Sequence, residues 1–213
     1  MKFKCIIFDC DGVLVDSETI SARIFMEMAE TLGYKMDFNV AVERFAGVSM
    51  KENLQFIEDN IKGSLPANFE EDFRKRTYLA FKTDLRPIKG IHNLLNKITV
   101  PFCTASSGPV EKIRLNLTTT NLLDKFENKI FSSYEIGSWK PDPGIYLHAA
   151  KKMGFSPDEC VVIEDSEAGV KAAIAGGFEV YVLANESKKS TFEKLGVNVV
   201  FSMDELGELL KID

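Results

Sequence analysis

The chain has 213 residues, of which 45% are apolar and 27% charged, an ordinary composition for a folded protein with one substantial core. Lys and Arg number 26 against 32 Asp and Glu, and this net charge of −6, with no basic cluster, argues against binding to nucleic acid. No stretch approaches the roughly 20 apolar residues that span a bilayer, and the N-terminal apolar run is too short for a signal peptide. We expect a cytoplasmic protein that works away from the membrane.

The number and spacing of cysteines and histidines argue against further classes of protein. The chain has four cysteines: Cys5, Cys10, Cys103 and Cys160. They form no C-x-x-C pair, which argues against disulfides and a structural zinc site, and buried free thiols are the ordinary interpretation. The only two histidines, His92 and His148, fall in helical patterns, so a Ser-His-Asp hydrolase is not favoured.

The first predicted strand is the apolar run at 5–8, which ends abruptly in an acid. Residues 17–85 then contain only amphipathic helical patterns, such as the four-residue repeat of Ile20, Ile24, Met28 and Leu32. We therefore predict an inserted all-α subdomain over 17–85, and an α/β core domain made of 1–16 and 86–213.

The rest of the chain alternates between strand and helix patterns. Further apolar runs predict buried strands at 101–105, 160–163, 180–183 and 197–201. Helical patterns cover 91–98, 145–153, 168–175 and 203–210. This alternation predicts a parallel sheet with helices on both faces.

Two acids, Asp9 and Asp11, directly follow the first predicted strand in the segment F-D-C-D-G. Ligands of open parallel sheets bind outside the carboxyl ends of the strands, and Gly12 allows a sharp turn there. One carboxylate could attack an electrophile while the other transfers protons or helps to hold a hard cation. An ordinary turn, in which Asp and Gly are common, explains the same pattern.

A second acid pair, Glu164 and Asp165, ends the predicted strand at 160–163. Adjacent carboxylates repel each other, and a bound cation is a natural reason to keep them together. The alternative is that Asp165 or Ser166 caps the following helix.

Hydroxyl groups and a lysine occur in two further segments. Ser106 and Ser107 follow the strand at 101–105 and could bind an anion at the start of the next helix, or simply cap it. Lys140, in a loop stiffened by two prolines, could neutralise charge on a nucleophile or a phosphoryl group. A solvated surface lysine is the alternative, and Trp139 beside it could line the site or pack nearby.

The order of these motifs resembles the haloacid dehalogenase (HAD) superfamily over essentially the whole chain. The motifs are D-x-D-G-x-x-x-D-S, a strand ending in Ser, K-P-x-P and E-D-S-x-x-G. The resemblance implies a Rossmann-like core with a helical cap of the first type between the first two motifs. It makes Asp9 the nucleophile and Asp11 the general acid and base, with Lys140 as the catalytic lysine.

The same resemblance implies a phosphate site and a magnesium site. Phosphate would bind to the Ser106 hydroxyl, the Ser107 N–H and the lysine. Mg²⁺ would be held by Asp9, the Asp11 carbonyl and Asp165, with Glu164 close by. The loop K-P-D-P-G differs from many relatives, which have Asp after the second proline.

The resemblance implies a phosphatase that acts on a small phosphorylated metabolite through an aspartyl-phosphate, closest to sugar-phosphate phosphatases of the 6-phosphogluconate type. A β-phosphoglucomutase is the alternative, but Met50 and Ser21 stand where that enzyme has an arginine and a histidine. A receiver-like phosphoacceptor switch is a third interpretation, which the long helical insertion opposes. We expect a monomer or a weak dimer.

Substrate discrimination is expected in the helical insertion, because the core motifs serve any phosphomonoester. Segment 47–51, with Lys51 able to reach an anionic or hydroxylated substrate tail, is the candidate. The alternative is that Lys51 is solvated and the segment only packs.

Overall fold

The structure, a computed structural model, describes residues 2–45, 48 and 50–211. The chain divides into two compact units, one made of residues 1–15 and 87–213 and the other of residues 16–86. We call them the core unit and the helical unit and describe each by itself.

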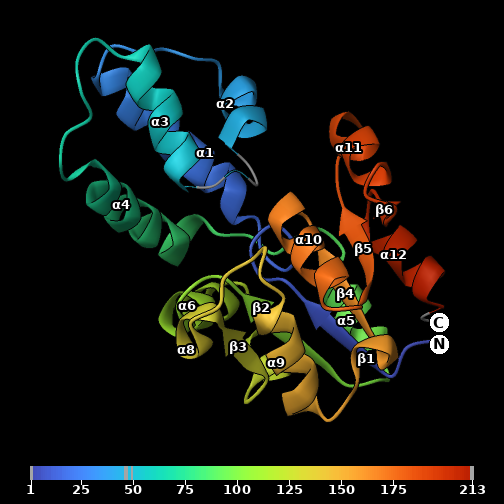
Figure 1. The fold of residues 1–213 in the computed structure, drawn as a ribbon. Helices are drawn as coiled ribbons and strands as arrows, with labels where there is room; N and C mark the ends of the chain where they lie inside the picture. Colours follow the sequence, from blue (N-terminus) through green and yellow to red (C-terminus); the bar gives the residue numbers. More distant parts are fainter. Residues whose placement is uncertain (1, 46–47, 49, 212–213) are drawn as a thin grey trace. The chain divides into compact units, whose positions relative to one another are not determined.

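The described part of the core unit contains a parallel sheet of six strands in the order β3-β2-β1-β4-β5-β6 (Figure 1). The strands are β1 (Cys5–Phe8), β2 (Phe102–Ser106), β3 (Ile130–Ser132), β4 (Cys160–Glu164), β5 (Glu179–Leu183) and β6 (Asn198–Val200). This confirms the predicted α/β fold with a Rossmann-like sheet. Strand β3 was not predicted from the sequence, because it has only three residues and Ser132 alone is fully buried.

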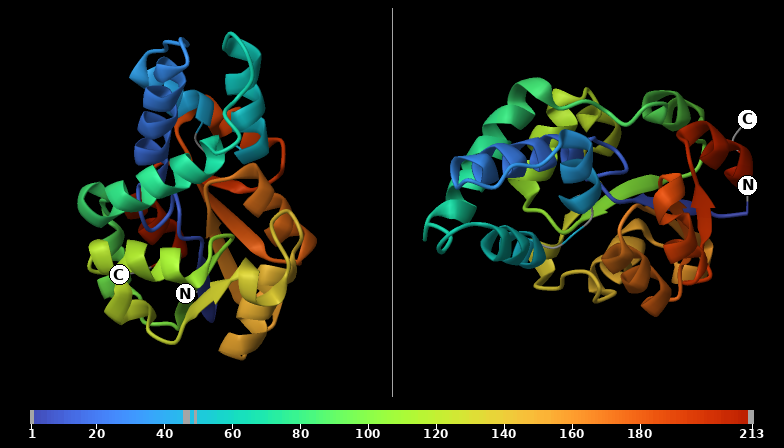
Figure 2. Two further views of the ribbon diagram at one scale, coloured as in Figure 1. Left: turned by 90° about the vertical axis from the view of Figure 1, so that its left-hand side faces the viewer. Right: turned by 90° about the horizontal axis from the view of Figure 1, so that it is seen from above.

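Helices cover both faces of this sheet, as the views in Figure 2 show. Helices α9 (Gly144–Met153) and α10 (Glu167–Ala175) lie on one face, whereas α5 (Ile91–Lys97), α6 (Val110–Thr119) and α12 (Met203–Leu210) lie on the other. The shorter helical segments are α7 (Leu123–Phe126), α8 (Ser133–Ile136), α11 (Lys189–Glu193), η1 (Pro157–Glu159) and η2 (Glu186–Lys188).

The centre of the sheet is buried on both sides, which explains its continuous apolar runs. In β1, Cys5 and Ile7 belong to the core cluster under α9 and α10. Phe8 points to the other face, where its ring meets those of Phe102 and Phe126 edge to face. Each fully buried Ile or Phe contributes about 1.5–3 kcal/mol. The four cysteines are buried free thiols.

The helical unit consists of α1 (Ser17–Thr31), α2 (Phe38–Phe45), α3 (Met50–Asn60) and α4 (Phe69–Asp84). Asp16 caps α1 by accepting a hydrogen bond from the Thr19 N–H. Aromatic rings form the interior, where Phe25 stacks on Phe73 at a centroid distance of 3.8 Å. No helix in the described ranges is both long and apolar enough to cross a membrane.

Candidate active site

The carboxyl end of β1 positions Asp9. Its N–H donates to the Ile163 carbonyl at 2.9 Å, so the pairing with β4 continues one residue beyond the strand. A tight turn follows, in which the Gly12 N–H donates to the Val15 carbonyl at 2.9 Å. Gly12 has a φ of +77°, a conformation that favours glycine. The sequence therefore brings two acids to the edge where ligands bind.

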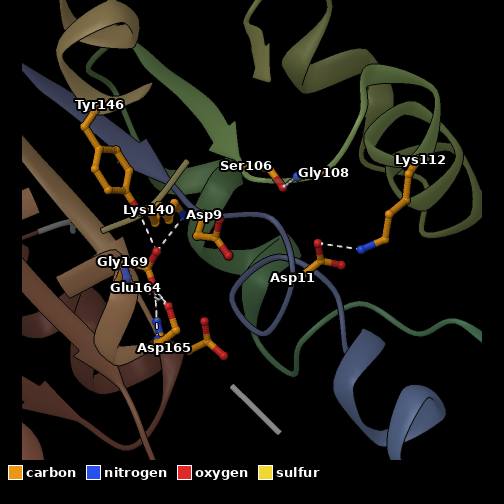
Figure 3. Close-up of polar contacts among 11 residues, drawn as sticks. Asp9, Asp11, Ser106, Gly108, Lys112, Lys140, Tyr146, Glu164, Asp165 and Gly169 are labelled. Atoms are coloured by element: carbon orange, nitrogen blue, oxygen red, sulfur yellow. Dashed lines mark hydrogen bonds and ion pairs between the residues drawn. The ribbon is translucent and has the colours of Figure 1, made fainter. Parts of the chain in front are cut away.

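Asp9, Lys140 and Glu164 form a buried charged group (Figure 3). The Lys140 ammonium donates to Asp9 Oδ1 at 2.5 Å and to Glu164 Oε1 at 2.6 Å. The exposed fractions of the three side chains are 10% for Asp9, 6% for Lys140 and 0% for Glu164. Burying a charge is costly unless it is paired, and here one ammonium is shared by two carboxylates.

The pKa shifts in this group have distinct causes. Burial, together with the nearby carboxylates of Glu164 and Asp11, raises the pKa of Asp9, although Lys140 opposes the rise. Burial alone would lower the pKa of Lys140 and raise that of Glu164. Their ion pairs outweigh burial, so the pKa of Lys140 is raised and that of Glu164 is lowered. The proton therefore stays on the lysine, and further positive charge beside Asp9 would favour its ionised form.

Glu164 is held by hydrogen bonds to both of its oxygens. Oε1 accepts from Lys140 and, at 2.6 Å, from the Tyr146 hydroxyl on α9. Oε2 accepts from the Asp165 N–H and from the N–H and hydroxyl of Ser166, at 2.8–3.0 Å. A Cβ atom on Gly169 would lie 1.7 Å from Oε1, so only glycine fits at this place on α10.

The loop that carries Lys140 is fixed by Asp142. The Asp142 carboxylate accepts from the Ser138 hydroxyl at 2.5 Å and from the Gly144 N–H at 2.8 Å. A Cβ atom on Gly144 would lie 2.3 Å from the Ser138 hydroxyl, so the glycine allows this contact. The unusual K-P-D-P-G sequence thus has its own anchor.

Asp11 is contacted by helix α6. Lys112 donates to Asp11 Oδ2 at 2.9 Å, and Asn116, one turn later, donates to Oδ1 at 3.3 Å. Figure 3 shows the Asp11 carboxylate facing Lys112. Two donors on one face of a helix therefore set the orientation of this carboxylate.

Ser106 ends β2, the neighbour of β1 in the sheet. Its side chain is buried, and its Oγ accepts a hydrogen bond from the Gly108 N–H at 3.1 Å. Ser107 is half-buried and leads, through Gly108 and Pro109, into α6. The hydroxyl therefore lies at the same edge of the sheet as Asp9.

Asp9, Glu164 and Asp165 together could hold a metal ion. Each offers a carboxylate oxygen, and these three atoms lie within 4.8 Å of one another. With Lys140, the group carries three formal negative charges and one positive, which leaves a surplus of two negative charges. Hard oxygen donors with such a surplus fit a divalent cation such as Mg²⁺.

The position of Asp165 depends on Gly12. A Cβ atom on Gly12 would lie 1.9 Å from Asp165 Oδ2, so the turn after β1 and the end of β4 can approach only with glycine there. Gly12 therefore makes room for Asp165, and Gly169 makes room for Glu164.

Comparison with known proteins identifies the family. The family model of haloacid dehalogenase-like hydrolases matches residues 3–177. The chain belongs to this family. The predicted family and the prediction of an enzyme are both confirmed.

Individual HAD relatives cover nearly the whole chain. The 6-phosphogluconate phosphatase of Escherichia coli (strain K12) is 33% identical over 211 residues, covering 99% of this chain and 96% of the relative. A phosphorylated carbohydrates phosphatase of Thermotoga maritima is 30% identical over 183 residues, covering 83% of this chain and 82% of the relative. A solved HAD-like protein of unknown function from Agrobacterium tumefaciens has a TM-score of 0.90 at 32% identity, with 98% of each chain covered.

Other residues singled out in the sequence lie elsewhere. His92 Nε2 is 3.0 Å from the Thr120 carbonyl, and the His148 ring packs edge-on against Phe131. Trp139 is half-exposed and contacts the Tyr134 ring. Lys51 lies in the first turn of α3 with an exposed side chain, whereas residues 47 and 49 of the same segment lie outside the described residues.

Three site residues were missed in the sequence: Lys112, Asn116 and Tyr146. The four-residue spacing of the first two, directly after the serine motif, is a signal that could have found them. Tyr146 carries no such signal, because a tyrosine in an apolar helix pattern is typical of core packing.

Proposed function

We propose that this HAD phosphatase depends on Mg²⁺ and hydrolyses a small phosphorylated metabolite, with 6-phosphogluconate as the leading substrate. The observation that carries the proposal is the Asp9 carboxylate at the end of β1, paired with Lys140 and grouped with two further acids. The substrate class is supported by the names of the two phosphatase relatives, which act on 6-phosphogluconate and on phosphorylated carbohydrates.

In the proposed reaction, Asp9 is the nucleophile. Its carboxylate oxygen forms a bond to phosphorus while the bond from phosphorus to the substrate oxygen breaks, and Asp11 gives its proton to that leaving oxygen. A water oxygen then forms a bond to the phosphorus of the aspartyl-phosphate while the bond from phosphorus to the Asp9 oxygen breaks. Asp11 takes a proton from that water, so that inorganic phosphate leaves and both aspartates return to their starting states. Lys140 stabilises negative charge on Asp9 and on the phosphoryl oxygens.

The phosphoryl group would be held at the ends of β1 and β2. Ser106 supplies a hydroxyl at this edge of the sheet, and the Ser107 N–H precedes α6, where free N–H groups favour an anion. The ammonium of Lys140 adds a positive charge on the other side of Asp9.

Mg²⁺ would be held by Asp9 and Asp165, together with the Asp11 carbonyl. When bound, the ion offsets the repulsion between the Asp9 carboxylate and the phosphate oxygens. Glu164 belongs to the same acidic group, but its oxygens accept five hydrogen bonds. We therefore assign Glu164 mainly to holding Lys140 and the turn after β4.

The two alternatives have less support. The mutase has less support, because the two phosphatase relatives are 33% and 30% identical to this chain, whereas a solved putative β-phosphoglucomutase of Thermotoga maritima is 27% identical. A receiver-like switch is opposed by the strand order 3-2-1-4-5-6, since receiver proteins have the order 2-1-3-4-5.

The helical unit, residues 16–86, is proposed to act as a cap that discriminates between substrates. Lys51, exposed on α3, is the candidate contact for an anionic substrate tail. Its replacement by alanine should lower kcat/KM on 6-phosphogluconate and leave a small aryl phosphate unaffected. An equal loss of kcat/KM on both substrates, or no loss, would exclude Lys51 as a residue that determines specificity.

The proposed location is the cytoplasm. Its reducing conditions suit the four free thiols.

Release of inorganic phosphate tests the proposal. The purified chain would be given 6-phosphogluconate, other sugar phosphates and a nucleotide, each with Mg²⁺ and with EDTA. We expect Mg²⁺-dependent release, fastest with 6-phosphogluconate. Release unaffected by EDTA would contradict the metal assignment, and conversion of a sugar 1-phosphate to its 6-phosphate would favour the mutase.

A further inference from the structure

Tyr146 is a fully buried polar residue to which the reaction above assigns no role. It lies on α9, six residues after Lys140 in the chain, and none of its surface is exposed. Its hydroxyl donates to Glu164 Oε1 at 2.6 Å, and the Lys140 ammonium lies 4.8 Å from the centre of its ring. Figure 3 shows the ring and the ammonium on the same side of Glu164.

The hydroxyl and the ammonium share one acceptor. Glu164 Oε1 accepts from Tyr146 and from Lys140, and the Lys140 ammonium also donates to Asp9. Glu164 Oε2 is fixed by the turn after β4, so the carboxylate cannot move away to find other donors. The tyrosine hydroxyl therefore determines how strongly Oε1 attracts the ammonium.

We propose that Tyr146 is a positioning residue that acts through Glu164 to keep the Lys140 ammonium against Asp9. The inference rests on the proposed function, in which Lys140 assists Asp9. The hydroxyl satisfies part of the acceptor capacity of Oε1, and the ring face adds a cation–π contact to the ammonium. Without the hydroxyl, Oε1 has one donor left among the described residues and draws the ammonium away from Asp9.

Tyr146→Phe is the direct test, because it removes the hydroxyl and keeps the ring. Hydrogen bonds to charged groups are strong enough for a loss of about tenfold in kcat, with KM changed by less than about twofold. Phe178→Leu is the matched control, because the Phe178 ring packs edge-on against Tyr146 in the same core cluster. This control should lower the melting temperature and leave kcat close to wild type.

A double-mutant cycle with Glu164→Gln tests whether the tyrosine acts through Glu164. The two changes should not add: in the Glu164→Gln background, Tyr146→Phe should change kcat by less than about twofold. The inference would be overturned if the effects of the two changes on kcat were fully additive. It would also be overturned if Tyr146→Phe left kcat unchanged, or if Phe178→Leu lowered kcat as much as Tyr146→Phe does.

A spectroscopic readout separates this inference from the proposed function. The ¹⁵N chemical shift of the Lys140 ammonium, assigned by its loss in Lys140→Arg, should change in Tyr146→Phe and stay constant in Phe178→Leu. If the wild-type protein released no phosphate, the proposed function would fail while this measurement still tested the contact. An unchanged shift in Tyr146→Phe would overturn the inference whatever the activity.

Discussion

Lys112 and Asp11 lie 101 positions apart in the chain, yet the lysine ammonium donates to the Asp11 carboxylate at 2.9 Å. Asn116, on the same face of α6, donates to the other carboxylate oxygen. The orientation of the proposed general acid and base is thus set by a helix that follows Ser106, the proposed phosphate-binding residue. This relationship gives the first prediction.

Lys112→Met should lower kcat by about tenfold, because the Asp11 carboxylate then loses its charged hydrogen-bond donor and its orientation is held less firmly. Lys112→Arg should recover part of the loss. Arg114→Met, on the same helix but in an exposed pair with Glu127, is the control and should retain wild-type kinetics. Steady-state phosphate release measures all three, and equal rates for Lys112→Met and wild type would exclude the positioning role.

Gly169→Ala should lower both activity and stability, since the added Cβ would lie 1.7 Å from Glu164 Oε1. Inserting a methyl group into a well-packed interior costs about 1–3 kcal/mol or more, which outweighs the gain of about 1 kcal/mol in helix propensity. Gly207→Ala in α12 is the matched helical control, because its Cβ would meet only the end of Leu94 at 3.3 Å. Denaturant unfolding and phosphate release should separate the two variants, and equal behaviour would contradict the close approach to Glu164.

Asp165→Asn should raise the Mg²⁺ concentration needed for half-maximal activity, because a carboxylate binds a hard cation better than an amide does. The expected increase is about tenfold or more, because the loss of a direct charged ligand should cost at least as much as the loss of a group that only orients one. Glu167→Gln removes an exposed acid two residues further on and should leave the Mg²⁺ dependence unchanged. The measurement is phosphate release at a series of Mg²⁺ concentrations. Identical curves for Asp165→Asn and wild type would show that Asp165 is not a metal ligand.

The pair of Lys4 and Glu159 gives a pH prediction outside the active site. Hydrogen bonds from Lys4 and then from Ser156 lower the pKa of Glu159 from 4.5 to about 2. Because the folded pKa lies below the unfolded one, this carboxylate stabilises the fold above about pH 4.5, and the contribution is lost as the pH falls toward 2.

Glu159→Gln should therefore unfold at a slightly lower denaturant concentration than wild type at neutral pH. The difference is small because the pair is exposed, and it should shrink as the pH falls below 4.5. Unfolding curves at a series of pH values measure it. A difference that stays constant with pH would show that the carboxylate charge does not stabilise the fold.

The sheet was largely predictable because its central strands are buried on both faces and so appear as unbroken apolar runs. The strand β3 was missed because its first two residues are only partly buried. In the helical unit, Phe38, Ala41 and Phe45 of α2 have helical spacing, so its helical character was predictable.

The candidate site was predictable where an acid directly follows a buried apolar strand, as at Asp9 and Asp165, because the ends of parallel strands meet at one edge of the sheet. The residues that orient these groups were not, because their partners are distant in sequence. Tyr146 and Glu164 are 18 positions apart, and each is ordinary in its own segment. The roles of Gly12 and Gly169 depend on close approaches that only the folded chain creates.

Detecting a phosphoryl group on Asp9 during turnover tests the central claim most directly. The enzyme would be mixed with 6-phosphogluconate and Mg²⁺, quenched in acid after less than one turnover and digested for mass spectrometry. We expect the phosphoryl mass on the peptide that contains Asp9, and neither that mass nor phosphate release in a folded Asp9→Asn variant. Phosphate release by Asp9→Asn at the wild-type rate, or a phosphoryl group on another residue, would contradict the account.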